Sequence, residues 1–184
     1  MPDEFSWVKR LARGDEQALG AIYDRFQGRI YRFAMQMTGD PSLAQDVTQE
    51  VFLSLLRKPE AFQPERGKLA SFLFGVARNH IRNRLRHERR YVELDPAETD
   101  GLTAGREDTA ELSGGEIREA VLALPGEYRE VIVLCEFQGM SYAEAAAALE
   151  TPIGTVRSRL HRARALLARK LAPQLKSEQP RVRS

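Results

Sequence analysis

The sequence predicts an all-α protein made of two small helical domains joined by a flexible acidic linker. Apolar residues recur at the spacing of amphipathic helices in most segments, and signals typical of strands are nearly absent. The 184 residues, 42% of them hydrophobic, suffice for one ordinary domain or two small ones with packed cores. The periodicity predicts helices near residues 4–13, 16–38, 42–57, 69–90, 115–124, 126–138, 142–150 and 154–171. Residues expected as N-caps or in turns are Asp15, Asp40, Ser113, Ser141 and Thr151.

Composition argues against several classes of protein. The one cysteine, Cys135, has no partner for an intramolecular disulfide, and the three scattered histidines offer no zinc-ligand spacing. No apolar run approaches the roughly 20 residues that a membrane span needs. The first residues are too polar for a secretory signal. We therefore expect a cytoplasmic protein that uses no metal or other cofactor.

The helix expected at residues 42–57 has two contrasting faces. Its buried stripe consists of Leu43, Val47, Val51 and Leu55. The opposite face carries Asp46, Gln49, Glu50, Leu53 and Arg57. An apolar side chain in the middle of an exposed polar face is typical of a protein-docking surface, although single exposed leucines are also common.

The helix expected at residues 69–90 presents a basic face. Its inward residues are Leu73, Phe74, Ala77, Ile81 and Leu85. Its outward residues are Arg78, Asn79, Arg82, Asn83 and Arg86. Asparagine and arginine suit contacts with base edges, and arginine also suits phosphates. Phe72 lies at the edge of this face, where an aromatic ring either stacks on an unpaired base or belongs to the core.

Residues 91–114 differ in kind from the helical segments. They are rich in Asp, Glu, Gly and Pro, and their single basic residue is Arg106. This composition predicts a flexible acidic linker. The simplest interpretation is that it is only a solvated spacer. The chain then divides into an N-terminal domain at 4–90, the linker at 91–114, a C-terminal domain at 115–171 and a disordered tail at 172–184.

The C-terminal domain contains the pattern of a helix-turn-helix. Ser141 and Glu144 form a capping box that starts the first helix of the pair. Pro152 then favours the start of a new helix over continuation of the old one. In the second helix the core stripe consists of Val156, Leu160, Ala163 and Leu167. The opposite side carries Ser158, His161, Arg162 and Ala165, flanked by Arg157, Arg159 and Arg164.

That arrangement is typical of a recognition helix in the major groove of DNA. Arginines at the rims bind phosphates, and the central side chains meet base edges. The alternative is an arginine-rich surface helix whose charges only solvate it. The capped short helix, the proline turn and the basic second helix together favour DNA binding.

Two sets of motifs resemble the sigma factors of bacterial RNA polymerase. The segments similar to sigma region 2 are Asp46–Phe52, Phe62–Lys68 and Ser71–Asn79. The segments similar to region 4 are Leu124–Pro125, Tyr128–Ile132 and Gly154–Arg164. Only the acidic linker separates them, which resembles the layout of the extracytoplasmic-function (ECF) group of the sigma-70 family, the smallest sigma factors.

The resemblance implies a role for each face. Docking on the clamp of the largest subunit of core polymerase is expected of Asp46, Gln49, Glu50 and Leu53. Binding and melting of the −10 element is expected of Phe72, Arg78, Asn79, Arg82, Asn83 and Arg86. Asn79 and the Phe62–Lys68 loop correspond to a pocket around a flipped-out base. Binding of the −35 element is expected of Thr155, Arg157, Ser158, Arg159, His161, Arg162 and Arg164.

The resemblance also implies partners. These are core RNA polymerase, promoter DNA and an anti-sigma factor, often membrane-bound, with no small-molecule substrate. The linker is expected to run through the active-site cleft of the polymerase.

The chain departs from the family pattern at two positions. Phe72 stands where many relatives carry Trp, which leaves its share in melting open. Glu150 stands where a glycine commonly ends the first helix of the pair. A left-handed Glu150 would cost roughly 1 kcal/mol, so we expect a slightly different turn instead.

Two other classes of function compete with this interpretation. A stand-alone helix-turn-helix regulator would bind duplex DNA by itself and present a dimerisation face, but it leaves the second basic helix unexplained. An enzyme is disfavoured because the sequence offers no glycine-rich phosphate loop and no nucleophile–base set.

Overall fold

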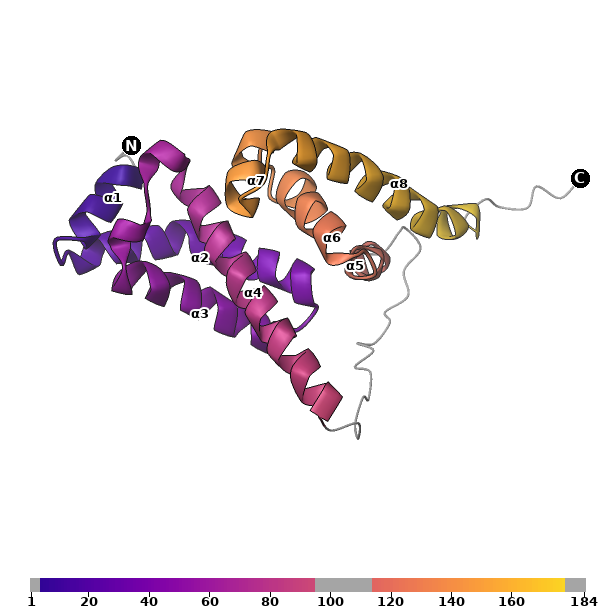
Figure 1. Cartoon of the computed structure of the whole chain (residues 1–184), viewed down its shortest axis with the longest axis horizontal. Helices are drawn as coiled ribbons and strands as arrows, with labels where there is room; N and C mark the ends of the chain where they lie inside the picture. Colours follow the sequence, from indigo (N-terminus) through magenta and orange to yellow (C-terminus); the bar gives the residue numbers. More distant parts are fainter. Residues whose placement is uncertain (1–3, 95–113, 178–184) are drawn as a thin grey trace, which may run out of the picture.

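The computed structural model describes residues 4–94 and 114–177, and the regular structure in these ranges is helical throughout, as predicted. Residues 95–113 of the predicted acidic linker and residues 178–184 lie outside the described residues, whereas the prediction that the linker includes residues 91–94 and Gly114 is wrong because these residues are helical. The N-terminal domain consists of α1 (Glu4–Leu11), α2 (Glu16–Thr38), α3 (Pro41–Arg57) and α4 (Leu69–Leu94), with short 3₁₀ turns at Pro59–Ala61 and Pro64–Arg66. The C-terminal domain consists of α5 (Gly114–Leu122), α6 (Gly126–Ile132), the π-helical segment η3 (Val133–Phe137), α7 (Tyr142–Leu149) and α8 (Ile153–Ser177). Figure 1 shows the two domains side by side, with the distal part of α4 projecting beyond both.

Local capping explains where several helices begin and end. Asp15 accepts a hydrogen bond from the Gln17 amide at the start of α2, and Asp40 accepts from Ser42 and Leu43 at the start of α3. Gly39 ends α2 with a left-handed φ of 75°, which glycine adopts without steric cost. The predicted bounds of α2 are therefore confirmed.

The segment predicted as one helix at residues 126–138 is interrupted. After α6 the backbone widens into η3, where the Gln138 amide donates to the Val133 carbonyl five residues earlier. Gly139, with a φ of 67°, then ends the turn. Hydrophobic periodicity does not distinguish a π turn from an α turn, because one extra residue per turn leaves most of the apolar stripe in place.

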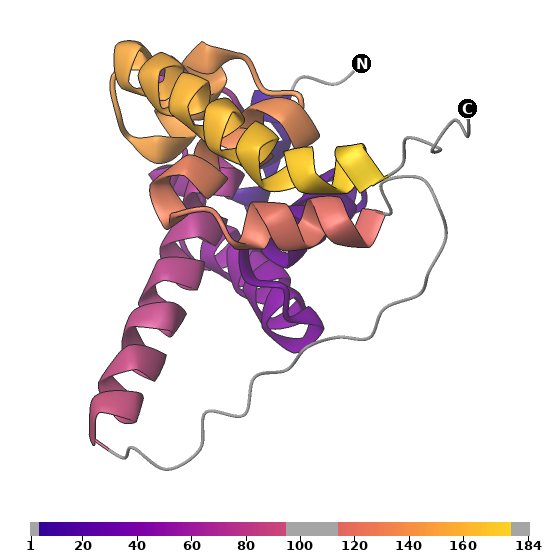
Figure 2. The same cartoon turned by 90° about the vertical axis from the view of Figure 1, so that its right-hand side faces the viewer.

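Helix α8 is longer than predicted. It continues to Ser177, whereas the sequence predicted its end at residue 171 and a disordered tail from residue 172. A proline inside a helix loses one hydrogen bond and crowds the preceding turn, yet the backbone of α8 stays helical past Pro173. Helix α5 lies alongside the distal half of α8 and contacts it (Figure 2).

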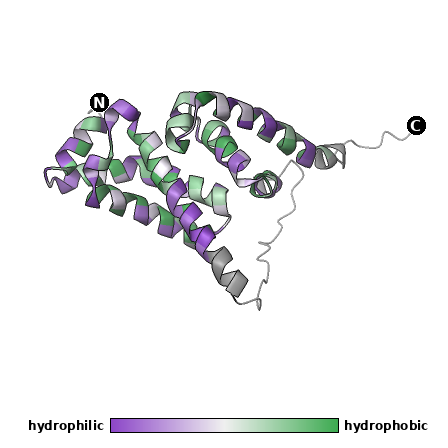
Figure 3. Cartoon of the chain, viewed as in Figure 1, coloured by the Kyte–Doolittle hydropathy of each residue, from purple (hydrophilic) through white to green (hydrophobic). Residues whose placement is uncertain are grey.

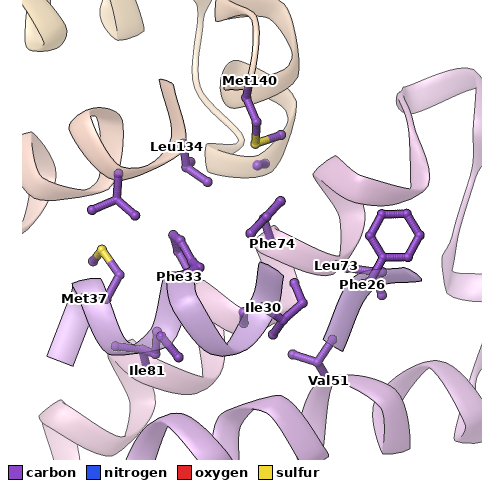
Figure 4. Packing of buried hydrophobic residues seen from close by; sticks show 14 of the residues in the cluster. Phe26, Ile30, Phe33, Met37, Val51, Leu73, Phe74, Ile81, Leu134 and Met140 are labelled. Carbon is purple, nitrogen blue, oxygen red and sulfur yellow. The ribbon is translucent and has the colours of Figure 1, made fainter. Parts of the chain in front are cut away.

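The two domains share one hydrophobic core. In Figure 4 Phe33 of α2 and Phe74 of α4 lie close to Leu134 and Met140 of the C-terminal domain. Phe33 and Phe74 pack edge to face, with ring centroids 5.2 Å apart. The domains therefore pack against each other, an arrangement on which the sequence was silent.

The predicted apolar stripes are buried with two exceptions. The stripe of α3 is buried along its whole length, as are Leu73, Ala77 and Ile81 of α4. Leu85 is 36% exposed, because α4 extends past the other helices of its domain at this point. Leu167 of α8 is only partly buried. An inward position on a helical wheel becomes buried only where another element covers it.

No helix within residues 4–94 and 114–177 combines the length and apolar character that a membrane crossing requires.

Candidate functional site

The polar face of α3 is exposed, and basic groups lie beside it. Asp46 and Gln49 are exposed, and Glu50 is half-buried. Arg84 of α4 approaches Asp46, with 3.9 Å between Nη2 and Oδ2, and Arg57 lies 3.6 Å from Glu50. These pairs are largely solvated and leave the carboxylates accessible to a partner.

The predicted exposed leucine of α3 is at a different position. Leu53 is half-buried, so the expectation that it stands in the middle of the exposed face is wrong. Leu56, which the sequence analysis did not single out, is instead 45% exposed. Side chains of neighbouring helices decide which of these residues is covered, and the wheel of α3 alone does not include them.

Most of the predicted basic face of α4 is accessible. Asn79, Arg82, Asn83 and Arg86 are exposed, the last three on the projecting part of the helix. Figure 3 shows hydrophilic residues recurring along α4 and along α8. An exposed arginine and asparagine face on a projecting helix suits contacts with a nucleic acid.

Arg78 does not belong to that exposed face. Its side chain is 12% exposed, and its Nε donates to Oε1 of Glu130 in α6 over 2.8 Å. The Glu130 side chain is only 7% exposed. The prediction that Arg78 stands free with its neighbours is therefore wrong for this arrangement, because α6 of the C-terminal domain covers that side of α4. The sequence carried no sign of Glu130 as its partner.

A cavity of about 650 Å³ lies where the sequence predicted a base pocket. The N-terminal domain contributes Asn79, Phe72 and the loop before α4. Phe72 is half-buried and packs edge to face on the buried Phe62, with centroids 5.8 Å apart. The structure thus brings Asn79 and the loop together. The opposite wall comes from the C-terminal domain and consists of Ala146, Ala147, Ala148, Glu150, Thr151 and Pro152.

An ion pair crosses this cavity's edge. Lys68 Nζ lies 2.7 Å from Oε1 of Glu144. The hydrogen bond from Lys68, with help from the Ser141 amide, lowers the pKa of Glu144 to about 2. The same contact raises the pKa of Lys68. Glu144 therefore caps α7 and holds a cation of the other domain at once.

The helix-turn-helix forms as predicted, except at its turn. Ser141 and Glu144 make the reciprocal hydrogen bonds of a capping box. Glu150 ends α7 with φ 51° and ψ 47°, so the expectation of a different turn is wrong. Its left-handed backbone lets the Thr151 amide reach the Ala146 carbonyl at 3.1 Å and close the helix end.

The outer face of α8 is polar and accessible. Arg157, Ser158, His161 and Arg162 are exposed, together with Ala165. Two flanking arginines pair within the domain, Arg159 with Glu127 at 3.0 Å and Arg164 with Glu136. Thr155 is half-buried near the start of the helix, and its carbonyl accepts from the Ser158 hydroxyl.

A pair of arginines that sequence reasoning missed joins the domains at the end of α2. Arg129 donates to the Met37 carbonyl at 2.6 Å and to the carbonyls of Leu124 and Leu122, and Arg118 donates to the Gly39 carbonyl at 2.9 Å. Positive charge is favourable at this carboxyl-terminal helix end. Burial lowers the pKa of Arg129. A lone arginine in a sequence gives no signal for such a role.

The described residues contain no cluster of three or more His, Cys, Asp or Glu side chains that could hold a metal ion.

Two family models match the chain. The model of Sigma-70 region 2 matches residues 22–91, and that of Sigma-70, region 4 matches residues 114–167. The chain is 32% identical to the ECF RNA polymerase sigma factor SigW of Bacillus subtilis over 178 residues, which are 89% of this chain and 94% of SigW. It is 35% identical to the ECF sigma factor SigL of Mycobacterium tuberculosis over 157 residues, 84% of this chain and 89% of SigL.

Two solved structures are similar over both domains. The sigma factor RpoE of Bartonella quintana, in complex with the anti-sigma factor NepR, has a TM-score of 0.73 and 25% identity over 83% of this chain and 96% of that chain. CnrH, in complex with the cytosolic domain of CnrY, has a TM-score of 0.69 and 26% identity over 96% of this chain and 99% of that chain.

Proposed function

The chain belongs to the ECF group of the sigma-70 family, and from this premise we propose which of its faces carries each step of promoter recognition. As a sigma factor it works with RNA polymerase to direct the initiation of transcription. The observation that supports the assignment of faces is the presence of two separate basic helix faces, on α4 and α8, in addition to the acidic face of α3. A regulator that binds DNA through a helix-turn-helix alone would not need the other two.

The face of α8 is proposed to bind the −35 element as duplex DNA. Arg157 and Arg162 are exposed and free to reach phosphates or base edges, with Ser158 and His161 between them. Arg159 and Arg164 are held by carboxylates of their own domain, which orients them at the rim of the helix. Thr155 completes the set near the start of the helix.

The face of α4 is proposed to bind the −10 element. Arg82, Asn83 and Arg86 are exposed on the projecting helix, where they can follow a DNA backbone. Asn79 and Phe72 line the cavity behind the Phe62–Lys68 loop. Their position supports the proposal that this cavity binds an unpaired base. Arg78 joins this set only after it leaves Glu130.

The polar face of α3 is proposed to dock on the clamp of the largest polymerase subunit. Asp46 and Gln49 are exposed, and Asp46, Gln49 and Glu50 line a groove with Arg84 of α4. Leu53 is half-buried, so only part of its side chain is available to contact the clamp. In this proposal the protein positions the polymerase and catalyses nothing itself.

A reconstituted transcription assay tests the proposal. The purified chain is mixed with core RNA polymerase and a library of promoter fragments, and run-off transcripts are sequenced. We expect transcripts that depend on the chain and share two sequence elements upstream of their start. If no transcripts form and the chain does not co-elute with core polymerase, the proposed assignment is wrong.

An anti-sigma partner is part of the proposal. The similar structure of the sigma factor RpoE is a complex with the anti-sigma factor NepR, and that of CnrH is a complex with the cytosolic domain of CnrY; both match this chain over both domains. We propose that the chain acts in the cytoplasm, where RNA polymerase works, and is held there by such a partner until a signal releases it.

A further inference from the structure

The cavity between the two domains is bounded by direct contacts between its walls. A Cβ atom placed on Gly75 would lie 3.1 Å from the Ala148 carbonyl oxygen, so α4 and α7 touch at this point. At the cavity's edge Lys68 Nζ lies 2.7 Å from Oε1 of Glu144. The space of about 650 Å³ is therefore a defined cavity, and its volume lies in the range of sites for small molecules.

A buried hydroxyl in the cavity wall has no partner in the protein. Ser71 lines the cavity and is 2% exposed, and its Oγ forms no hydrogen bond with any of the described residues. A buried hydroxyl without a partner costs free energy, which a ligand that donates or accepts a hydrogen bond would recover. Ser71 therefore points to a bound molecule with polar atoms.

The N-terminal wall has the groups that bind an adenine base. Phe72 is a half-buried aromatic residue of this wall, and aromatic rings stack on bases. Asn79 is exposed and adds a carboxamide, which carries a donor and an acceptor side by side. Adenine is the base that presents the matching acceptor and donor, at N7 and N6, to such an amide.

Other lining residues match the sugar and the phosphate of a nucleotide. Arg66 is exposed and forms no ion pair within residues 4–94 and 114–177, so its guanidinium is available to a phosphate. Glu150 and Thr151 of the C-terminal wall supply a carboxylate and a hydroxyl, which suit hydrogen bonds to ribose hydroxyls. The site for a whole nucleotide is therefore complete only when both domains contribute to it.

We propose that the cavity between the domains binds a free adenine nucleotide. Its base lies against Phe72 and Asn79, its ribose against Glu150 and Thr151, and its phosphate against Arg66. The inference deepens the proposed function, since the N-terminal wall is the one assigned there to an unpaired base. The contacts from Glu150 and Thr151 distinguish the free nucleotide, because the proposed −10 contacts lie on the N-terminal domain alone.

Calorimetric titration of the full chain tests the proposal with adenosine monophosphate (AMP) as the probe. Adenosine, inorganic phosphate and cytidine monophosphate are the comparisons. We expect AMP to bind at least about tenfold more tightly than each of them, because only AMP combines adenine with a phosphate. No saturable binding of AMP below about 1 mM, or equal affinities for AMP and cytidine monophosphate, would overturn the inference.

Ser71→Ala should have two effects of opposite sign. It removes the unpartnered buried hydroxyl, so the free chain should unfold at a higher temperature. It also removes a hydrogen bond to the ligand, so AMP should bind about fivefold more weakly. If Ser71→Ala stabilises the free chain and leaves the affinity for AMP unchanged, the hydroxyl does not face a ligand and the assigned site is wrong.

Two further variants test the phosphate contact and the C-terminal wall. Arg66→Gln should weaken AMP binding about tenfold and leave adenosine binding unchanged, because it removes only the cation for the phosphate. Thr151→Val keeps the size of the side chain and should weaken AMP binding about threefold. Arg32→Gln, at an exposed arginine of α2 that does not line the cavity, is the control. Equal affinities for AMP in all three variants would overturn the inference.

The titration and the transcription assay separate the two proposals. If the chain gives transcripts with core polymerase but does not bind AMP, the nucleotide site is wrong and the proposed function stands. If AMP binds with the expected dependence on Arg66 and Thr151 but no transcripts form, the proposed function is wrong and the nucleotide site stands.

Discussion

Glu150 is the only non-glycine residue with a positive φ in the described ranges. Its left-handed backbone closes α7 and sets the turn into the proposed recognition helix. A side chain in this region of φ and ψ is strained by roughly 1 kcal/mol relative to glycine. The turn geometry is therefore retained against a local cost, because the hydrogen bonds of the helix end require it.

Glu150→Gly is expected to raise the free energy of unfolding by up to about 1 kcal/mol, since it removes the strain at this position. Urea denaturation followed by circular dichroism measures it. Glu150→Asn, which also tolerates the left-handed region, should give a smaller gain. A loss of stability in both variants would show that the Glu150 side chain stabilises the fold by other means.

Glu144 should make the stability of the chain depend on pH. Its pKa is lowered from 4.5 to about 2 in the folded protein, so its contribution is present above pH 4.5 and is lost as the pH falls toward 2. Lys68 is 70% exposed, and solvent screening therefore keeps this contribution small. We expect Glu144→Gln to remove this part of the acid sensitivity. Parallel stability–pH curves for the two chains between pH 5 and 2 would contradict the assignment.

Arg162 is the exposed arginine at the centre of the proposed −35 face. Arg162→Ala should lower transcription from the chain's promoters about tenfold, because one arginine contact to a base or phosphate is lost, with binding to core polymerase unchanged. Arg169→Ala, two turns further along the same side of α8, is the control. Loss of core binding in Arg162→Ala would mean that the two domains have been assigned the wrong roles.

At the scale of elements, α3 shows how a helix serves two purposes. Its apolar stripe is buried against α2 and α4, and its polar face remains open to a partner. The periodicity of the sequence predicts both faces. It does not predict that Leu53 is half-buried while Leu56 is exposed, because neighbouring side chains decide this.

Asp46→Ala with Gln49→Ala should weaken binding to core polymerase about tenfold, since it removes two accessible side chains from the proposed docking face. Co-elution with core polymerase at graded concentrations measures this effect. Asp24→Ala with Gln27→Ala changes the same residue types at the same spacing on the exposed face of α2 and should leave binding unchanged. Equal weakening by the two pairs would point to a general loss of charge or stability instead.

At the scale of the whole molecule, the packing of the two domains depends on a core that both share. Leu134 lies in the C-terminal domain and is buried close to Phe33 and Phe74 of the N-terminal domain (Figure 4). Arg129 and Arg118 also donate hydrogen bonds to backbone carbonyls at the end of α2, which adds a polar connection between the domains. The two domains should therefore influence each other's stability.

Leu134→Ala is expected to destabilise the chain by about 2–5 kcal/mol, because it leaves a cavity in the shared core. Trp7, the only tryptophan, lies in α1 of the N-terminal domain. Its fluorescence transition in urea should move to lower concentration together with the circular dichroism signal. An unchanged Trp7 transition would show that the N-terminal domain unfolds independently of the C-terminal one.

The sequence by itself determined the positions of most helices, the stripes that form the core of each domain and the family. These features repeat within single segments, so hydrophobic spacing, capping residues and short motifs specify them locally. Only the tertiary structure decided the pairing of Arg78 with Glu130, the covering of the cavity beside Asn79 by α7 and the exposure of Leu85. Each of these depends on which distant helix lies opposite, and contacts between residues far apart in the chain leave no periodic trace in the sequence.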